Sequence, residues 1–520
     1  MVLPRSMKRT KQVSLVACPS EIISQIVGNL DKSSLSRLAL SSRFLNVITT
    51  PYLYDHIEFL GHSRNWSSPE SIAFRNLTLL LLERPHLAGY VRHFTMRKDF
   101  GREGRGEHSE IPHLPQALLK AIEAASHSKE EERQWLEDVS CTKSMNGDAL
   151  MALVLPTLRN LKPLDLRLGD DIMYFSRMMQ RASRKEKPFD TRPAFEKLAD
   201  IMYMQNRRVW TSCDAENLDD DEQPYFTAMA FPLPAVHRLF ALKCGFQFGI
   251  GIQGHKIRGP LVFPLACGLS PQLSHLELRE CHVKSQTLVD ILWVPAALKS
   301  FIYEVIAKMT DSSVFNITIY RAMEHQMSSL ENIWLDCVPW NEDLLRFHQF
   351  GNARPMPSFA NFKNLRTLRI ASPFLFGNIT LQQRERKAYR DLLAPLLPES
   401  LTTLHITRCD YNPTFICNET EFLLVRLTNT THLSKIILEG LCWGGGFAWG
   451  PIITYLADLA EGKNISLSAV NGGPEHHADD QYDWKGLGID GSLPWAEARG
   501  DNPAKVFDGQ KALIALASIT

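Results

Sequence analysis

The chain has 520 residues, enough for about two to four domain-sized units and a large core. Apolar residues make up 44% of it and charged residues 22%, proportions that exclude a mainly disordered or fibrous protein. Lys and Arg together number 57, as do Asp and Glu, so the net charge of zero gives no general attraction to nucleic acid or an anionic membrane. No window approaches about eighteen consecutive apolar residues, so we expect no transmembrane helix.

The cysteines and the N-terminus bear on the compartment. Ten cysteines occur without a single Cys-x-x-Cys, which speaks against a zinc ribbon, a thioredoxin-like redox pair and a disulfide framework. The basic N-terminus is followed by only a short, interrupted apolar stretch at residues 13–18, whereas a secretory signal needs about 7–15 apolar residues. We therefore expect a cytoplasmic and/or nuclear protein.

The first predicted element is a helix that begins after Pro19. Its apolar residues fall at helical spacing on one face: Ile22, Ile23, Ile26, Val27 and Leu30. Proline is tolerated in a first helical turn, and Glu21 suits the positive end of the helix dipole. The stretch is therefore predicted to form a short amphipathic helix.

Two more short helices are predicted directly afterwards. Asp31 or Ser33 can cap the second helix, and a third covers residues 41–49, with Pro51 expected to end it. Their apolar positions are Leu35 and Leu38 in the second helix and Phe44, Val47 and Ile48 in the third. Three helices in about forty residues cannot bury all of these side chains among themselves, so we expect some to hold a partner.

These helices carry an ordered motif. Its residues are Cys18-Pro-Ser-Glu-Ile-Ile23, Ile26, Leu30, Ser34-Leu35, Leu38, Ser42-Arg43-Phe44, and Pro51-Tyr-Leu-Tyr54 with Ile57. The pattern resembles an F-box, and the F-box-like module would span residues 13–60. Two positions depart from the family pattern. Cys18 stands where leucine is usual, and Ser34 stands where an acidic residue is common.

The F-box resemblance implies a partner. F-boxes dock the Skp-type adaptor of a cullin–RING ubiquitin ligase, so the resemblance implies the same partners here. The residues that it assigns to adaptor binding are Pro19, Ile22, Ile23, Ile26, Leu30, Leu35, Leu38, Arg43 and Phe44. The alternative is an ordinary three-helix cap on the domain that follows.

Beyond the module, the frame apolar-x-x-apolar-x-apolar recurs, as in Leu273-Leu276-Leu278. The copies begin at residues 91, 161, 236, 273, 298, 330, 365, 401 and 433, and the first two gaps are close to two periods each. Helical stretches are predicted at residues 68–83, 147–155 and 384–397, before the copies that begin at 91, 161 and 401. Cys244, Cys281 and Cys409 follow the frame where a small residue bonds the backbone, so we expect structural rather than reactive thiols.

The alternation of frame and helix predicts an α/β fold in which parallel strands form one face and helices the other. We expect an irregular leucine-rich-repeat solenoid over residues 68–470 and a loop with a C-terminal cap over 471–520. It resembles the degenerate leucine-rich repeats that follow F-boxes in many fungal-type proteins. The alternative is an irregular α/β domain with coincidental leucine spacing.

Four other motifs have weak chemical interpretations. Residues 249–254 match Gly-x-Gly-x-x-Gly, but Gly259-Pro260 leaves no room for the required helix. Residues 101–106 lack the Gly-Lys-Ser/Thr of a phosphate loop, and the acidic run 219–222 suits a solvated insertion. Residues 475–477 could supply metal ligands but lie in an expected polar turn. We expect no catalytic residue, no cofactor and no metal.

The combined expectation is a non-enzymatic substrate receptor of a Skp–cullin–F-box type ubiquitin ligase, whose repeats bind a protein substrate. The alternative is a repeat scaffold that acts without the cullin ligase. Neither nucleic acid nor membrane is an expected partner. Exposure of Ile22, Ile26 and Leu35 would favour the receptor, whereas their packing onto the repeats would favour the scaffold. Trp334, Trp340 and Trp443 are either anchors for a partner or core residues.

Overall fold

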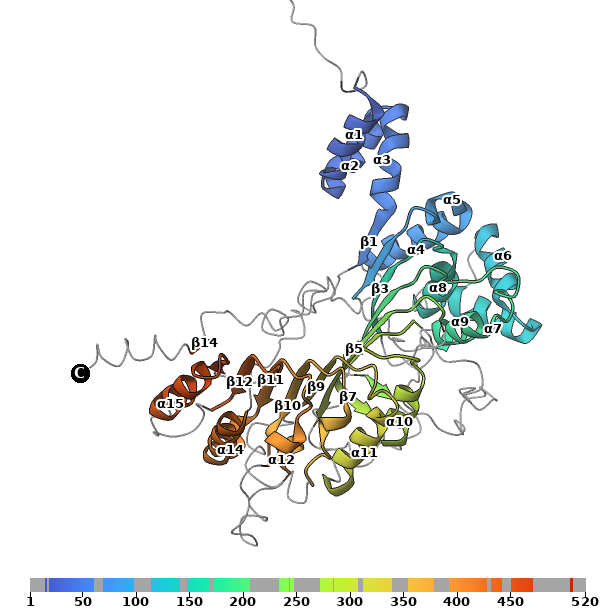
Figure 1. Cartoon of the computed structure of the whole chain (residues 1–520). Coiled ribbons are helices and arrows are strands. Elements are labelled where there is room, and N and C mark those ends of the chain that lie inside the picture. Colours follow the sequence, from blue (N-terminus) through green and yellow to red (C-terminus); the bar gives the residue numbers. More distant parts are fainter. Residues whose placement is uncertain are drawn as a thin grey trace, which may run out of the picture. The chain divides into compact units, whose positions relative to one another are not determined.

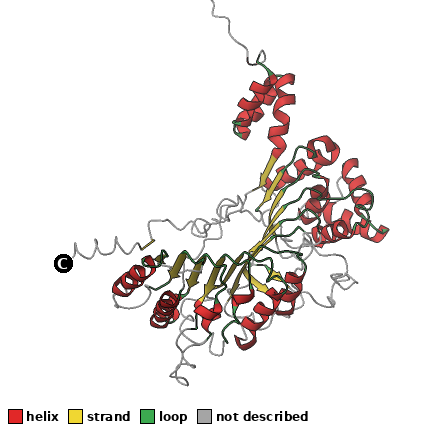
Figure 2. Ribbon diagram, viewed as in Figure 1, coloured by secondary structure: helices red, strands yellow, loops and turns green. Residues whose placement is uncertain are grey.

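The computed structural model shows an α/β protein (Figures 1 and 2). It describes residues 15, 18–59, 69–97, 114–140, 147–168, 173–205, 233–242, 244–246, 272–283, 285–306, 312–338, 354–377, 392–427, 432–441, 450–470 and 506–507. The chain divides into two compact units. Unit 1 comprises residues 1–212 and 232–236, and unit 2 comprises residues 213–231 and 237–520.

Unit 1 begins with three helices, α1 (Ser20–Gly28), α2 (Lys32–Ser41) and α3 (Arg43–Asp55), here called the N-terminal module. The Asp31 side chain caps α2 by accepting the backbone N–H of Ser34 at 2.9 Å. Ser42 caps α3 in the same way. Three predicted helices are therefore present.

Pro51 does not end the third helix, so the predicted end at residue 49 is wrong. Helix α3 continues through Pro51 to Asp55. Proline removes only its own N–H donor, and Tyr52 and Leu53 still pack against the module's core. Lys32 Nζ also donates to the carbonyls of Tyr52 and Leu53 at 2.6 and 2.8 Å, which satisfies two acceptors of the last turn.

The sheet of unit 1 is parallel. Its strands are β1 (His56–Phe59), β2 (His93–Met96), β3 (Pro163–Leu168) and β4 (Asp200–Gln205). Strand β1 pairs with β2, and the repeat frame begins at Tyr54, at the end of α3, and continues in the strand with Ile57 and Phe59. Residues 56–59, which the predicted module of residues 13–60 includes, therefore form a strand of the sheet.

The two long gaps in the repeat frame differ. Strand β4 fills the second gap, and its Leu198 lies 37 residues after Leu161, so the prediction of two periods is confirmed there. In the first gap β2 pairs directly with β3, with Phe94 beside Leu164, so no repeat intervenes and that prediction is wrong. The extra length forms α6 (Gln116–Ala125), α7 (Lys129–Ser140), α8 (Gly147–Val154) and the turn η2 (Leu155–Thr157).

The remaining helices of unit 1 are α4 (Pro69–Glu83), α5 (Pro85–Ala88) and α9 (Met173–Arg184). Helix α4 coincides with the helix predicted over residues 68–83, and α8 with the one predicted over 147–155. Both predictions are confirmed. Every residue of α8 is buried, as expected for an apolar helix that its neighbours enclose.

Unit 2 continues the repeat pattern with further parallel strands of the same sheet. Its strands in order are β5 (Arg238–Leu242), β7 (His275–Val283), β8 (Ser300–Ile306), β9 (Asn332–Val338), β10 (Thr367–Ala371), β11 (Thr403–Thr407), β12 (Lys435–Glu439) and β13 (Ser466–Val470). Strand β6 (Gly245–Phe246) pairs with β7, and β14 (Val506–Phe507) is antiparallel to β13.

The strand register of unit 2 confirms the predicted repeat frame. The middle apolar residues of the frame lie side by side across the sheet: Leu239, Leu276, Phe301, Ile333, Leu368, Leu404 and Ile436. All are buried. From β5 to β12, one carbonyl at the start of each repeat accepts two N–H groups of the next, as Lys299 does from Glu331 and Asn332 at 2.8 and 3.0 Å. The packing of the core residues and the hydrogen bonds that begin each strand thus recur with the same period.

Helices cover one side of this sheet (Figure 1). They are α10 (Ser285–Trp293), α11 (Ser312–Glu324), α12 (Ser372–Phe376), α14 (Pro413–Arg426) and α15 (Gly450–Glu461), with the turns η9 (Phe359–Asn361), η10 (Ala394–Leu396) and η11 (Cys409–Tyr411). Residues 384–391 of the helix predicted over 384–397 lie outside the described residues, and η10 is the only helical turn in its described part.

The three predicted structural cysteines are buried, as expected. The thiol of Cys409 donates to the carbonyl of Ile406 at 3.2 Å, and that of Cys281 to the carbonyl of Arg279 at 3.1 Å. Cys244 donates to Leu242. Burial raises the pKa of the Cys409 and Cys281 thiols well above the ordinary value, so both stay protonated and unreactive.

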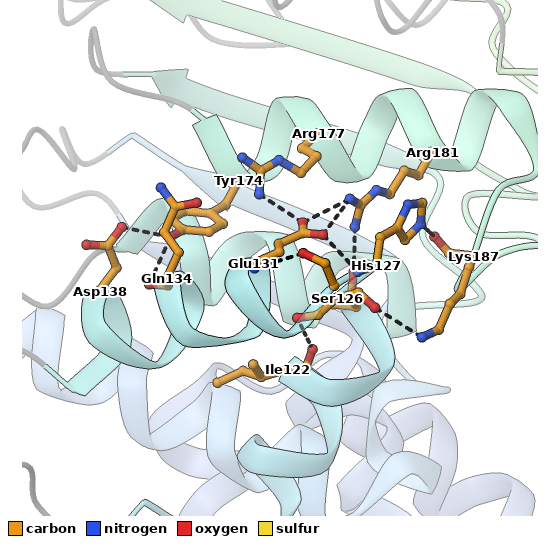
Figure 3. A network of polar contacts seen from close by, with 12 residues as sticks. Ile122, Ser126, His127, Glu131, Gln134, Asp138, Tyr174, Arg177, Arg181 and Lys187 are labelled. Atoms are coloured by element: carbon orange, nitrogen blue, oxygen red, sulfur yellow. Dashed lines mark hydrogen bonds and ion pairs between the residues drawn. The ribbon is translucent and has the colours of Figure 1, made fainter. Parts of the chain in front are cut away.

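A polar network joins the inserted helices of unit 1 (Figure 3). Glu131 of α7 accepts from Arg177 and Arg181 of α9 at 2.8 and 2.9 Å. Burial alone would raise the pKa of Glu131, but the two guanidinium groups and the His127 N–H outweigh it and lower that pKa to about 2. Tyr174 donates to Asp138 at 2.7 Å. The insertion is therefore held by ion pairs as well as by apolar packing.

Asp148 gives the insertion a pH dependence that can be measured. Its buried carboxylate accepts the backbone N–H groups of Tyr174 and Phe175, yet burial dominates and raises its pKa to about 7. The folded state thus binds this proton more tightly than the unfolded state. The resulting stabilisation is complete below about pH 4 and is lost as pH rises through about 7, at about 1.4 kcal/mol per pH unit.

We expect Asp148→Asn to remove this dependence. The difference in unfolding free energy, wild type minus variant, should become smaller when the pH is raised from 5 to 8, as measured by urea titration. An equal difference between the two proteins at both pH values would contradict the assignment.

Candidate functional site

The N-terminal module has its own closed core. Ile23, Val27, Leu35 and Leu45 are buried together, and Leu15, Cys18, Leu30, Leu38, Ile48, Tyr52 and Leu53 pack partly against them. Ile23 and Leu35 were predicted to contact the adaptor, but both lie inside the module. Their assignment to a docking surface is therefore corrected: these side chains hold the three helices together and do not face a partner.

Other predicted contact residues lie on the surface. The exposed fractions are 45% for Ile22, 39% for Ile26 and 42% for Phe44, with 74% for Val47 and 86% for Leu40. These are five of the eleven exposed large hydrophobic side chains among the described residues, although the module supplies only about a ninth of those residues. Such a concentration of exposed apolar area is typical of an interaction surface.

Helical geometry groups these side chains. Ile22 and Ile26 are four residues apart and share one face of α1, while Phe44 and Val47 are three apart and share one face of α3. Of the other predicted residues, Pro19 and Arg43 are exposed, and Leu30 and Leu38 are half-buried. The F-box resemblance assigns neither Val47 nor Leu40 to adaptor binding. The helical spacing places Val47 beside Phe44 among the apolar positions from which partner contacts are expected, whereas no sequence feature singles out Leu40.

The burial of Leu35 leads to a test of the module's fold. We expect Leu35→Asp to unfold the module, because the new charge would be desolvated among Ile23, Val27 and Leu45 at a cost of several kcal/mol, about 3 or more. Limited proteolysis should then cleave within residues 18–55. Ser36→Asp, at the exposed neighbouring position, should leave the protease pattern unchanged. Resistance of both variants would show that Leu35 is not a core residue.

A second cluster lies on the sheet of unit 2. Strand residues that alternate with the core positions are ionisable, apart from one tryptophan, and are nearly all buried: Glu277, Arg279, Glu304, Trp334, Asp336, Arg369 and His405, with the half-buried Glu439. We call this set the inner-face network. The guanidinium carbons of Arg279 and Arg369 lie 4.4 and 4.0 Å from the ring centre of Trp334. Trp334 is therefore one of the predicted core tryptophans.

Ion pairs extend the inner-face network across repeats. Arg369 lies 3.0 Å from Glu439 and 3.5 Å from Asp336, and His405 Nε2 lies 2.9 Å from Glu439. Arg279 contacts Glu277. Burial on its own would raise the pKa of Glu277, but the charge of Arg279 outweighs burial and keeps that pKa below its ordinary value. The network links strands β7 to β12 and stabilises the stack of repeats.

The remaining predicted motifs, at residues 101–106, 219–222, 249–254 and 475–477, lie outside the described residues, as do Trp340 and Trp443. Within the described part of the chain, no group of three metal-ligating side chains comes together. No described helix is both long and apolar enough to cross a membrane. No protein-family model matches the sequence, and no curated protein matches it.

Proposed function

We propose that this chain is the substrate-recognition subunit of a Skp–cullin–F-box type ubiquitin ligase. The observation that carries the proposal is the exposed apolar set of the N-terminal module: Ile22, Ile26, Leu40, Phe44 and Val47. The module's core is complete without them. Full burial of an exposed large side chain contributes about 1.5–3 kcal/mol, and burial of one that is already half-buried contributes less, so contact with the whole set would add several kcal/mol to the binding of a partner.

Exposure of Ile22, Ile26 and Leu35 was expected to distinguish the receptor from the scaffold, and two of these three residues favour the receptor. Ile22 and Ile26 are exposed, and Leu35 packs inside the module rather than on the repeats. The stacked repeats that follow the module suit the second half of the proposed function, because they present an extended surface to a protein partner. The chain would bring that protein to the ligase without catalysing ubiquitin transfer itself.

The experiment offers the immobilised full-length chain a purified Skp-type adaptor, then a cullin–RING complex. We expect the adaptor to bind at one to one and the cullin to be retained only when the adaptor is present. Retention of the adaptor without the cullin would favour the scaffold alternative. Failure of the adaptor to bind at micromolar concentration would contradict the proposal.

A further inference from the structure

A hollow of about 880 Å³ lies beside the N-terminal module within unit 1. Helix α3 lines one wall with Val47, Ile48, Pro51, Tyr52 and Asp55, and α1 adds Ser24. The other wall comes from the segments that lead into strands β2, β3 and β4, and comprises Gly89, Tyr90, Arg92, Asn160, Lys162 and Lys197. The hollow therefore joins the module to the first repeats.

Apolar groups continue from the module into this hollow. Val47 belongs both to the exposed apolar set and to the wall of the hollow, and Tyr90 is exposed on the opposite wall. A partner that covers Val47 on the module therefore reaches the hollow without a break. Tyr90 offers it an aromatic contact of the kind that is common at the centre of interfaces.

The charged side chains around the hollow are mostly basic. Arg92, Lys162 and Lys197 are exposed, and Asp55 is the acidic side chain in its lining. Arg92 lies 3.5 Å from Asp55, and Lys197 donates to the amide oxygen of Asn160 at 2.6 Å, which carries no charge. Three cations and one anion leave a local charge of +2, in a chain whose net charge is zero.

We propose that this hollow receives an acidic segment, carrying an apolar side chain, of the same protein that docks on the module. The inference rests on the proposed function and names a second contact for the adaptor. Lys162 and Lys197 attract the acidic segment during encounter, and Tyr90 with Val47 holds its apolar side chain. The first repeats thus fix how the adaptor is oriented on the chain.

The test measures association and dissociation of the purified Skp-type adaptor on the full-length chain at 50 and 300 mM salt. We expect Lys162→Glu/Lys197→Glu to slow association at least tenfold at the lower salt and to flatten its salt dependence. Tyr90→Ala should speed dissociation several-fold. Lys363→Glu/Lys435→Glu, a matched pair of exposed lysines in unit 2, should change neither rate.

The outcomes separate this inference from the function on which it rests. Unchanged rates for both Lys162→Glu/Lys197→Glu and Tyr90→Ala, in a chain that otherwise binds the adaptor tightly, would overturn the hollow as a contact and leave the module as the docking site. No binding by the wild type would overturn both. Equal slowing by the unit 2 pair would show an effect of net charge alone and would also overturn the hollow.

Discussion

Ile22→Asp/Ile26→Asp is expected to abolish adaptor binding by the full-length chain. Both side chains are exposed on one face of α1, so neither aspartate is desolvated in the free protein and the module stays folded. In the complex, two apolar contacts are lost and two charges are buried. We expect the affinity to fall at least a thousandfold in equilibrium binding measurements.

The control for this variant is Ile452→Asp. Ile452 is a similarly exposed isoleucine on helix α15 of unit 2, so it tests whether any new surface charge impairs binding. We expect wild-type affinity from it and wild-type thermal unfolding from both variants. Retention of adaptor binding by Ile22→Asp/Ile26→Asp would remove the F-box assignment.

Arg369→Met is expected to destabilise unit 2 by about 3–5 kcal/mol. Removal of one partner of a buried ion pair takes compensation away from the charge that stays, and here Asp336 and Glu439 both lose the guanidinium. The stacking of Arg369 on Trp334 is lost as well. Urea unfolding followed by tryptophan fluorescence should report the change, because Trp334 lies inside the network.

Arg366→Met is the matched control for this prediction. Arg366 lies three residues earlier, just before strand β10, and is exposed, so its loss should change the unfolding free energy by less than about 0.5 kcal/mol. Equal, small effects of the two substitutions would show that the inner-face network contributes little to the stability of the repeats.

The repeat frame could be predicted from sequence because it records burial directly. Copies such as Leu368 with Ile370 and Leu404 with Ile406 place apolar residues two apart, and in the fold these side chains pack on the helix side of neighbouring strands in register. Helix α4 was predictable for the same reason, since its spacing of apolar residues differs from that of the strands.

Other parts of the fold were not predictable from local pattern. Tyr54 and Ile57 fit both the end of the F-box-like motif and a repeat frame that continues to Phe59, and only the pairing of β1 with β2 shows the frame. The 70-residue gap was compatible with a hidden repeat or with inserted helices. Helix α3 passes through Pro51 because contacts from Lys32 and the module's core outweigh the local rule.

The candidate site shows the same limit at the level of single residues. Ile22 and Ile23 are adjacent isoleucines, yet the first is exposed and the second is buried. Only one face of α1 packs against the other two helices of the module, and Ile23 lies on that face. The inner-face network also escaped prediction. Its charged residues occupy positions that the apolar frame does not specify. Which of them come together depends on the register of neighbouring strands.

The central claim is that the adaptor covers the exposed apolar set of the N-terminal module. Hydroxyl-radical footprinting of the full-length chain, with and without the adaptor, tests this directly because it reports side-chain exposure. The account predicts that oxidation of Ile22, Ile26 and Phe44 falls on binding, while that of Val425 and Tyr455, exposed in unit 2, stays constant. Protection of Val425 or Tyr455 with unchanged oxidation of Ile22, Ile26 and Phe44 would contradict it.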